Sequence, residues 1–318
     1  MSPSCRRRTN LARDSSHMRL TRLTLACLAL VPLLVGCGVL VAAEPNAVPQ
    51  NGPRQIDVTY AEVDGHKLPL RLFLPKDVKN PPLVVYIHGG SWRAGSYRSC
   101  ELASLTEQGF AVASIEHRFT NVAIFPAQIH DCKGAIRWLR ANAAKYGYDA
   151  SRIGVTGTSA GGHLAVLLGT SGDVADLEGT VGGNLDQSSR VAAVIDYFGP
   201  TDFVLRAKTH PERANAVGSS TYGLLGGPAI EKTDQARRAS GVTYVSAGDP
   251  PLLIIHGDQD KTVYLDQSES IRKAYEAAKL EVDMILVPGG GHGGKVFFTG
   301  ENFRRAQEFL EKHLRGNR

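Results

Sequence analysis

The chain has 318 residues, enough for one large domain or two modest ones, and 42% of them are hydrophobic, which suffices for a large core. Residues 1–43 carry six arginines and one aspartate, so the whole formal net charge of +5 belongs to this segment. Residues 44–318 are formally neutral and offer no basic face, which argues against a nucleic-acid partner.

The first 43 residues have the organisation of an export signal. An arginine-rich start is followed by an uncharged run at 23–43 that ends in small residues. Residues 34–37 resemble a bacterial lipobox, which would leave a lipidated Cys37 at the new N-terminus and attach the protein to a membrane. Ordinary signal peptidase would instead cut after Ala43, and an uncleaved membrane anchor is the third alternative. We therefore expect an exported protein, either periplasmic, extracellular or lipid-anchored.

Past this signal, a proline- and asparagine-rich linker is expected at 44–55, followed by strands that alternate with helices. A hairpin around Asp64 and Gly65 is expected to join the first two strands, at 56–63 and 68–74. Further strands are expected at 83–87, 110–115, 153–156, 191–197, 252–255 and 282–287. Helices are expected at 127–146, 160–168, 268–278 and 302–314. This alternation predicts an α/β fold, a mostly parallel sheet with helices on both faces.

Residues 203–248 fit the alternation poorly, because they contain polar stretches and a glycine-rich segment. We interpret them as a small lid-like insertion over one edge of the sheet. The insertion belongs to a single domain at 56–318 and could shape a binding site there.

Two cysteines, Cys100 and Cys132, remain past the export signal, apart from Cys37 if it is retained. An exported protein permits a disulfide, but two cysteines do not make a disulfide framework. Separate buried thiols and a single bond both remain open.

A serine lies on the turn between the strand expected at 153–156 and the helix expected at 160–168. Residues 157–161 match G-x-S-x-G around Ser159, and small neighbours allow the strained backbone that such a turn requires. The hydroxyl would then stand free above the sheet, and the N-terminus of the next helix would favour developing negative charge. Ser159 is therefore the candidate nucleophile.

A glycine pair follows the strand expected at 83–87, in the segment H-G-G-S-W at 88–92. Backbone N–H groups without a Cβ beside them can face a substrate oxygen, and with the N–H of Ala160 they would form an oxyanion hole. A simple turn that ends the strand is the alternative. Trp92 could form the floor of an acyl or sugar site, or it could serve only in packing.

Two further loops offer partners for the serine. Asp258 and Asp260 follow a predicted strand in H-G-D-Q-D, and either carboxylate could hold a histidine in the right tautomer. His292 lies in the loop G-G-G-H-G after the next strand, from where it could reach Ser159. The other histidines lie in the export signal, in polar contexts or inside the motifs, or lack a suitable loop, as His117 and His130 do, so His292 is the best candidate base. No histidine has metal-ligand spacing, and no metal or cofactor is expected.

These motifs, with F-P-A-Q at 125–128 and F-G-P-T-D at 198–202, resemble those of α/β-hydrolase esterases related to hormone-sensitive lipase. Among these the small bacterial carboxylesterases and the acetyl or feruloyl esterases are the most similar branch. The resemblance spans about residues 57–315 and implies the α/β-hydrolase fold, with its nucleophile, acid and base in this chain order. The residues that it implies are Ser159 as nucleophile, His292 as base, Asp260 as acid, and Gly90, Ser91 and Ala160 as oxyanion-hole donors. Ser91 stands where a third glycine is commoner, which keeps its N–H available.

The resemblance implies two-step acyl transfer on short-chain acyl esters, with acetyl groups on polysaccharide as one candidate substrate. A serine peptidase related to prolyl oligopeptidase is an alternative, although the chain has no room for the added propeller of those enzymes. A catalytically silent binding module is the other alternative, which the filled triad positions disfavour.

Overall fold

The computed structural model describes residues 52–316, and the predicted export signal with Cys37 lies outside them. The strands are β1 Arg54–Val63, β2 His66–Leu74, β3 Pro82–Ile87, β4 Ala111–Ile115, β5 Asp149–Thr158, β6 Ala193–Tyr197, β7 Leu252–Gly257 and β8 Val282–Val287. The α-helices are α1 Ala127–Tyr146, α2 Ala160–Thr170, α3 Ala175–Glu178, α4 Phe203–Thr209, α5 Pro211–Ala214, α6 Ser220–Leu225, α7 Thr233–Ala239, α8 Asp266–Ala277 and α9 Gly300–Arg315. The 3-10 helices are η1 Ala103–Gln108, η2 Gly241–Tyr244 and η3 Lys295–Phe297.

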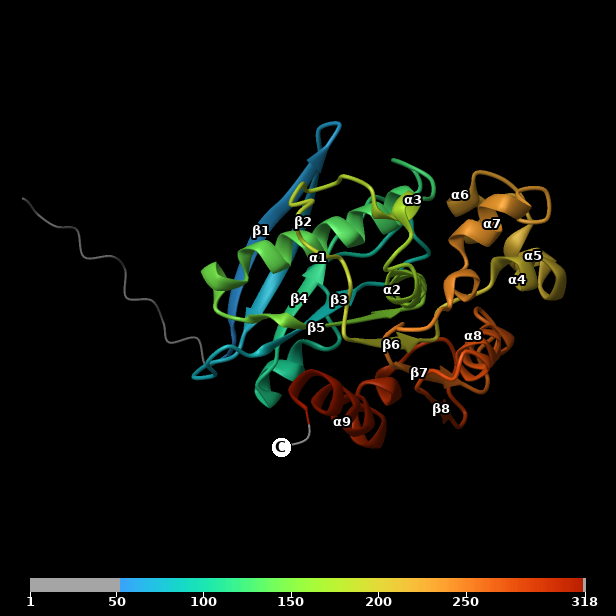
Figure 1. Ribbon diagram of the computed structural model, residues 1–318. Helices are drawn as coiled ribbons and strands as arrows, with labels where there is room; N and C mark the ends of the chain where they lie inside the picture. The colour runs from blue at the N-terminus through green and yellow to red at the C-terminus, as the bar shows by residue number, and fades with distance from the viewer. Residues whose placement is uncertain (1–51, 317–318) are drawn as a thin grey trace, which may run out of the picture. The chain divides into compact units, whose positions relative to one another are not determined.

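The strands form one sheet in the order β1-β2-β4-β3-β5-β6-β7-β8 (Figure 1). β1 and β2 make an antiparallel hairpin, β2 is antiparallel to β4, and every other neighbouring pair is parallel. The predicted mostly parallel sheet is therefore confirmed. The carboxyl ends of β3, β5, β7 and β8 lie at the same edge, and the four predicted motifs follow these ends.

Alternate side chains of the central strands face two separate cores. In β3, Leu83, Val85 and Ile87 contribute to the core that includes α1, α2 and α8. Val84 and Tyr86 contribute to the core that includes η1 and α9, on the other face (Figure 1). All residues of β3, β4 and β6 are buried, as expected of strands covered on both faces.

Most element boundaries lie within two residues of the prediction, and β5 extends furthest beyond it. β1 begins at Arg54, two residues inside the segment predicted as a linker at 44–55. β5 begins at Asp149 rather than at the predicted residue 153, because Asp149 already pairs with Pro82 of β3. The first residues of β5 are polar, so a prediction based on apolar runs did not include them.

Helix α1 buries charged side chains as well as apolar ones. Lys133 and Arg137 are fully buried and both contact the carboxylate of Glu178 in α3, with 3.1 Å between Lys133 Nζ and Glu178 Oε2. Asp131, also fully buried, accepts from Arg118, with 2.7 Å between Asp131 Oδ1 and Arg118 Nη2. Each buried charge thus has an opposite charge beside it, as burial requires.

The insertion predicted at 203–248 contains α4 to α7 and η2. The N–H of Phe125, after β4, donates to Leu224 O of α6 at 2.9 Å, and the N–H of Val242 donates to Thr201 O, after β6, at 3.3 Å. The segment therefore lies against the loops that leave the carboxyl ends of β4 and β6. Its interpretation as a lid remains a prediction.

Cys100 and Cys132 are separate thiols in the structure. Cys132 is fully buried within α1, and Cys100 is half-buried before η1. The disulfide that the sequence left open is not formed.

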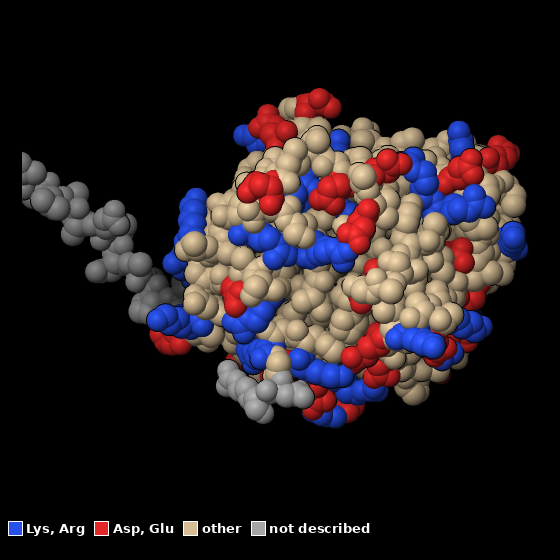
Figure 2. Space-filling model, in the orientation of Figure 1, with Lys and Arg blue, Asp and Glu red and all other residues tan. Residues whose placement is uncertain are grey.

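The surface carries both signs of charge. Figure 2 shows Lys and Arg side chains interspersed with Asp and Glu over the visible face, in keeping with the formal neutrality of residues 44–318. From residue 52 to residue 316, no helix combines the length and the apolar character that a bilayer crossing needs.

Candidate active site

Ser159 occupies a strained turn between β5 and α2. Its φ of 54° and ψ of −115° lie where non-glycine residues rarely occur. Two glycines make the turn feasible, since a Cβ on Gly157 would lie 2.3 Å from Gly161 O and one on Gly161 would lie 2.0 Å from Ile87 O. The serine sits at the N-terminus of α2, where the helix dipole favours negative charge.

His292 contacts both of its predicted partners. Its Nε2 lies 2.9 Å from Ser159 Oγ, and its Nδ1 lies 2.6 Å from Asp260 Oδ2. Because a carboxylate only accepts, Nδ1 carries the proton and Nε2 of the neutral ring accepts from the serine hydroxyl. The ring also packs edge-on against Phe198, with 5.0 Å between the centroids. The structure thus brings together the three residues predicted as a triad.

Asp260 is held as a carboxylate by four donors. Its Oδ1 accepts from the N–H groups of Thr262 at 2.7 Å and Val263 at 3.0 Å. Its Oδ2 accepts from His292 and also faces His256 Nε2 at 3.2 Å. Burial opposes the charged form, but the hydrogen bonds from His256 and His292 outweigh it and hold the pKa of Asp260 well below its usual value.

Asp258 has a different position from Asp260. It is exposed, and its Oδ1 accepts from the N–H of Gly289 at 2.8 Å, which caps the turn after β8. Of the two aspartates left open by the residues alone, the one next to His292 is Asp260.

The predicted oxyanion loop lies against the nucleophile. A Cβ on Gly89 would be 3.5 Å from Ser159 Cβ, so the backbone after β3 passes directly beside the serine. Within the described part of the chain, the N–H groups of Gly90, Ser91 and Ala160 have no hydrogen-bond acceptor. Unsatisfied N–H groups beside a nucleophile are what an oxyanion hole requires.

Ser91 and Trp92 form the centre of a tight turn. The N–H of Arg93 donates to Gly90 O at 3.1 Å, and the two central residues have φ of 58° and 56°. These angles mark a type I′ turn, for which glycine or asparagine is usual. The serine in place of a third glycine therefore keeps its N–H but occupies a strained backbone position, a consequence that the sequence did not reveal.

Trp92 packs inside the protein and does not form an open substrate floor. Its side chain is 3% exposed, and its Nε1 donates to His163 Nδ1 at 3.1 Å. Since the indole only donates, His163 carries its proton on Nε2, which donates to Ala239 O of α7 at 2.7 Å. The ring also packs against Phe203 of α4. Of the two roles considered for Trp92, the structure places it in packing.

A second carboxylate, Glu116, supports the oxyanion loop and was missed from the sequence. His88, at the start of this loop, directs Nε2 at Glu116 Oε1 and Nδ1 at Gly89 O, both at 2.7 Å. His117 stacks on His88, and burial with the nearby His88 lowers the pKa of His117 to about 3. The only signal for Glu116 was its position directly after the buried strand β4.

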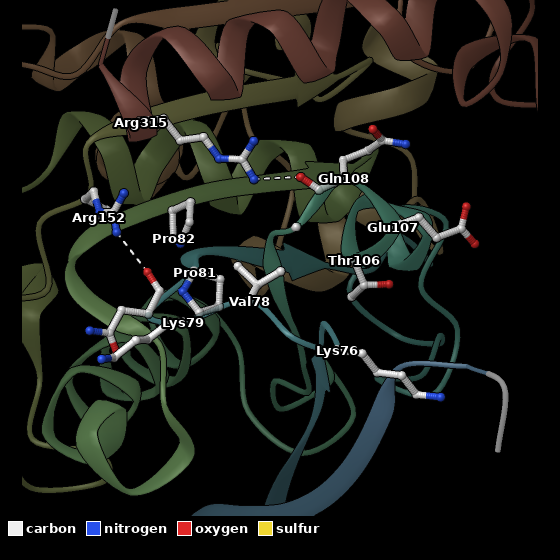
Figure 3. Close-up of a pocket in the computed structure, with 12 residues that line it drawn as sticks. Lys76, Val78, Lys79, Pro81, Pro82, Thr106, Glu107, Gln108, Arg152 and Arg315 are labelled. Atoms are coloured by element: carbon white, nitrogen blue, oxygen red, sulfur yellow. Dashed lines mark hydrogen bonds between the residues drawn. The ribbon is translucent and has the colours of Figure 1, made fainter. Parts of the chain in front are cut away.

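A cavity of about 450 Å³ lies at the amino ends of β3 and β4, away from these residues (Figure 3). None of the predicted site residues lines it. Its two arginines bind backbone carbonyls, with Arg152 donating to Asn80 O at 2.8 Å and Arg315 donating to Gln108 O at 2.6 Å. Arg152 of β5 and Arg315 of α9 thus hold neighbouring segments of the backbone, and the cavity lies outside the candidate active site.

Within the described residues, no group of three or more His, Cys, Asp or Glu side chains is placed so that it could bind a metal ion. The chemistry that this arrangement can perform is nucleophilic attack by a serine, with proton transfer through a histidine.

Comparison with known proteins identifies several similar chains. Esterase LipC of Mycobacterium tuberculosis is 32% identical over 220 residues, which are 68% of this chain and 53% of LipC. Esterase LipQ of the same organism is 29% identical over 67% of this chain and 50% of its own length. The chain thus spans about half the length of these curated relatives.

Solved structures extend the likeness to carbohydrate esterases. A truncated form of a carbohydrate esterase from gut microbiota is 35% identical, with a TM-score of 0.77 over 84% of this chain and 99% of that one. A bifunctional GH43-CE protein of Bacteroides eggerthii is 36% identical, with a TM-score of 0.75 over 82% of this chain and 35% of that one. The predicted α/β-hydrolase fold and the resemblance to its esterases are confirmed. The BD-FAE family model matches residues 70–275, more than half of the sequence, and the chain belongs to this family.

Proposed function

We propose that this chain is a serine carboxylesterase that hydrolyses short-chain acyl esters, including acetyl groups carried by polysaccharide. The observation that carries the proposal is the continuous hydrogen-bond chain from Ser159 Oγ through His292 to Asp260. The names of the curated relatives support ester hydrolysis. The carbohydrate esterase that aligns over 99% of its length supports a sugar-linked ester.

The mechanism follows from the proton positions. As Ser159 attacks the ester carbonyl, His292 Nε2 takes its proton, and the Asp260 carboxylate stabilises the imidazolium. The N–H groups of Gly90, Ser91 and Ala160 donate to the oxygen that becomes negative, and each such donor contributes on the order of 3 kcal/mol. His292 then protonates the leaving alcohol, and water repeats the sequence on the acyl-enzyme.

The test is substrate turnover by the wild type and by Ser159→Ala. We expect the wild type to release acetate from acetylated xylan and to hydrolyse p-nitrophenyl acetate faster than esters of longer acids. Ser159→Ala should lower kcat by a factor on the order of 10⁶, because only substrate binding and the oxyanion hole then remain to promote the reaction. An unchanged circular dichroism spectrum would show that the fold is intact.

Ester turnover, labelling by a fluorophosphonate and peptide cleavage together distinguish the remaining alternatives. A folded variant Ser159→Ala with full activity would contradict the nucleophile assignment. A wild type that folds but does not react with a fluorophosphonate would favour the binding module. Cleavage of proline-containing peptides without ester turnover would favour the peptidase related to prolyl oligopeptidase.

A further inference from the structure

His256, at the end of β7, is a fully buried histidine that the mechanism above does not use. Its Nδ1 lies 2.6 Å from Ser268 Oγ of α8. Its Nε2 lies 2.8 Å from Val263 O and 3.2 Å from Asp260 Oδ2. A carbonyl oxygen only accepts, so Nε2 carries a proton whether the ring is neutral or charged. The same N–H therefore points at both Val263 O and the Asp260 carboxylate.

The oxygen that His256 faces is the one that orients His292. Asp260 Oδ2 accepts from His292 Nδ1 at 2.6 Å, and the His256 N–H, which donates to Val263 O, also faces this atom with 3.2 Å between Nε2 and Oδ2. With the two backbone donors on Oδ1, each oxygen of the carboxylate has two N–H groups facing it. The carboxylate cannot rotate without losing several of these bonds, so its orientation toward His292 is fixed.

We propose that His256 is a positioning residue for ester hydrolysis, which holds Asp260 in place and moderates the basicity of His292. The inference rests on the proposed function. A carboxylate that shares its charge with a second donor is a weaker acceptor and stabilises the His292 imidazolium less. His292 then stays neutral, and able to accept the serine proton, at a lower pH than it would without His256.

The charged, titratable and polar groups around this pair come from five segments: the loop after β7, α8, β6, the loop after β8 and α4. His256 faces Asp260 on its own loop, the hydroxyl of Ser268 on α8 and the charge of Asp196 on β6. Asp260 faces His292 and the charge of the buried Arg206 on α4. Burial raises the pKa of Asp196 to about 7, so this acid can ionise within the pH range of the experiment. The neutral variant Asp196→Asn therefore serves as a background that separates the two groups.

The experiment measures how the rate of Ser159 phosphonylation by a fluorophosphonate depends on pH between about 5 and 9. This probe needs a neutral His292 but no knowledge of the natural ester. His256→Gln places an amide N–H close to the position of Nε2, whereas His256→Leu removes the donor. The acidic limb of the curve of rate against pH should move up by about one pH unit in His256→Leu. In His256→Gln it should stay near that of the wild type. The shift should persist in the Asp196→Asn background.

Ser268→Ala is a less disruptive variant, to be used if His256→Leu does not fold. The hydrogen bond from Ser268 polarises the ring and strengthens its N–H as a donor, so Ser268→Ala should move the limb in the same direction by a smaller amount. Acidic limbs that coincide in every folded variant would overturn the inference, because a packing role slows the reaction without moving the limb. A wild type that does not react at any pH would overturn the proposed function instead.

Discussion

Asp258 and Asp260 are two residues apart in one loop, but their surroundings assign them different roles. Asp260→Asn should lower kcat for p-nitrophenyl acetate by about 10⁴-fold, because an amide N–H facing His292 Nδ1 favours the wrong tautomer. Asp258→Asn keeps a side-chain oxygen for the N–H of Gly289 and should change kcat less than about threefold. The reverse order of losses would assign the acid to Asp258.

A buried acid at the end of β6 gives a pH-dependent contribution to stability. Asp196 Oδ1 accepts from the N–H of Gly199 at 2.9 Å, and no donor reaches Oδ2 in residues 52–316. Burial raises its pKa to about 7, above the value of about 3.9 in an unfolded chain. The folded state thus favours the protonated acid, and the stability that Asp196 contributes is full below about pH 4 and is lost as the pH rises through 7.

Asp196→Asn should therefore be more stabilising at pH 8 than at pH 5, because the amide cannot ionise. About two pH units separate pH 5 from the folded-state pKa of about 7, and they correspond to roughly 2.7 kcal/mol, which is the upper limit of the change between the two pH values. Urea unfolding of both proteins at the two pH values measures it, and the comparison cancels groups such as Asp260 that act in the opposite direction. The same free-energy difference at both pH values would show that Asp196 ionises normally.

At the scale of single residues, the sequence predicted which side chains carry the chemistry, but it did not predict all of their contacts. Ser159 and His292 could be placed because each lies in a small-residue loop after an apolar strand. The choice between Asp258 and Asp260, and the support of His88 by Glu116, depend on where side chains point across separate loops. Residue type and spacing hold no information on that direction.

At the scale of elements, α1 has the predicted bounds because its apolar spacing runs up to Gly147, which ends the helix with a φ of 85°. Its neighbour α3 was not predicted, since four residues are too few for a helical period. The burial of Lys133 and Arg137 was hidden for the same reason, because their partner Glu178 belongs to α3. The sequence predicted an insertion at 203–248 but not the short helices α4 to α7 within it.

Glu178→Gln tests the contact between α1 and α3. The change leaves two fully buried cations without their carboxylate, and we expect a loss of about 2 kcal/mol in the free energy of unfolding. This is less than for a fully buried pair, because the Glu178 side chain is 33% exposed. Glu276→Gln removes the exposed pair with Arg272 and should cost less than about 0.5 kcal/mol. Equal losses in the two variants would show that α3 adds no buried ion pair.

At the scale of the whole molecule, we propose that the chain is exported and that its basic segment is removed. Cutting before Cys37 and cutting after Ala43 both remove all six arginines, so either mature form is formally neutral. The intact mass of protein purified from a bacterial host distinguishes a diacylated Cys37 from a chain that begins at residue 44. A mass that includes residue 1 would contradict processing and favour the retained anchor.

The hydrogen bonds from Trp92 to His163 and from His163 to the carbonyl of Ala239 limit how the α4–α7 segment can be redesigned. The last acceptor is a backbone carbonyl, which every amino acid supplies. The bonds therefore constrain the path of the α4–α7 segment at residue 239 and leave its sequence free to vary. A transplanted segment of unrelated sequence should keep the oxyanion loop in place if it delivers a carbonyl to His163, whereas a similar sequence that follows another path should not.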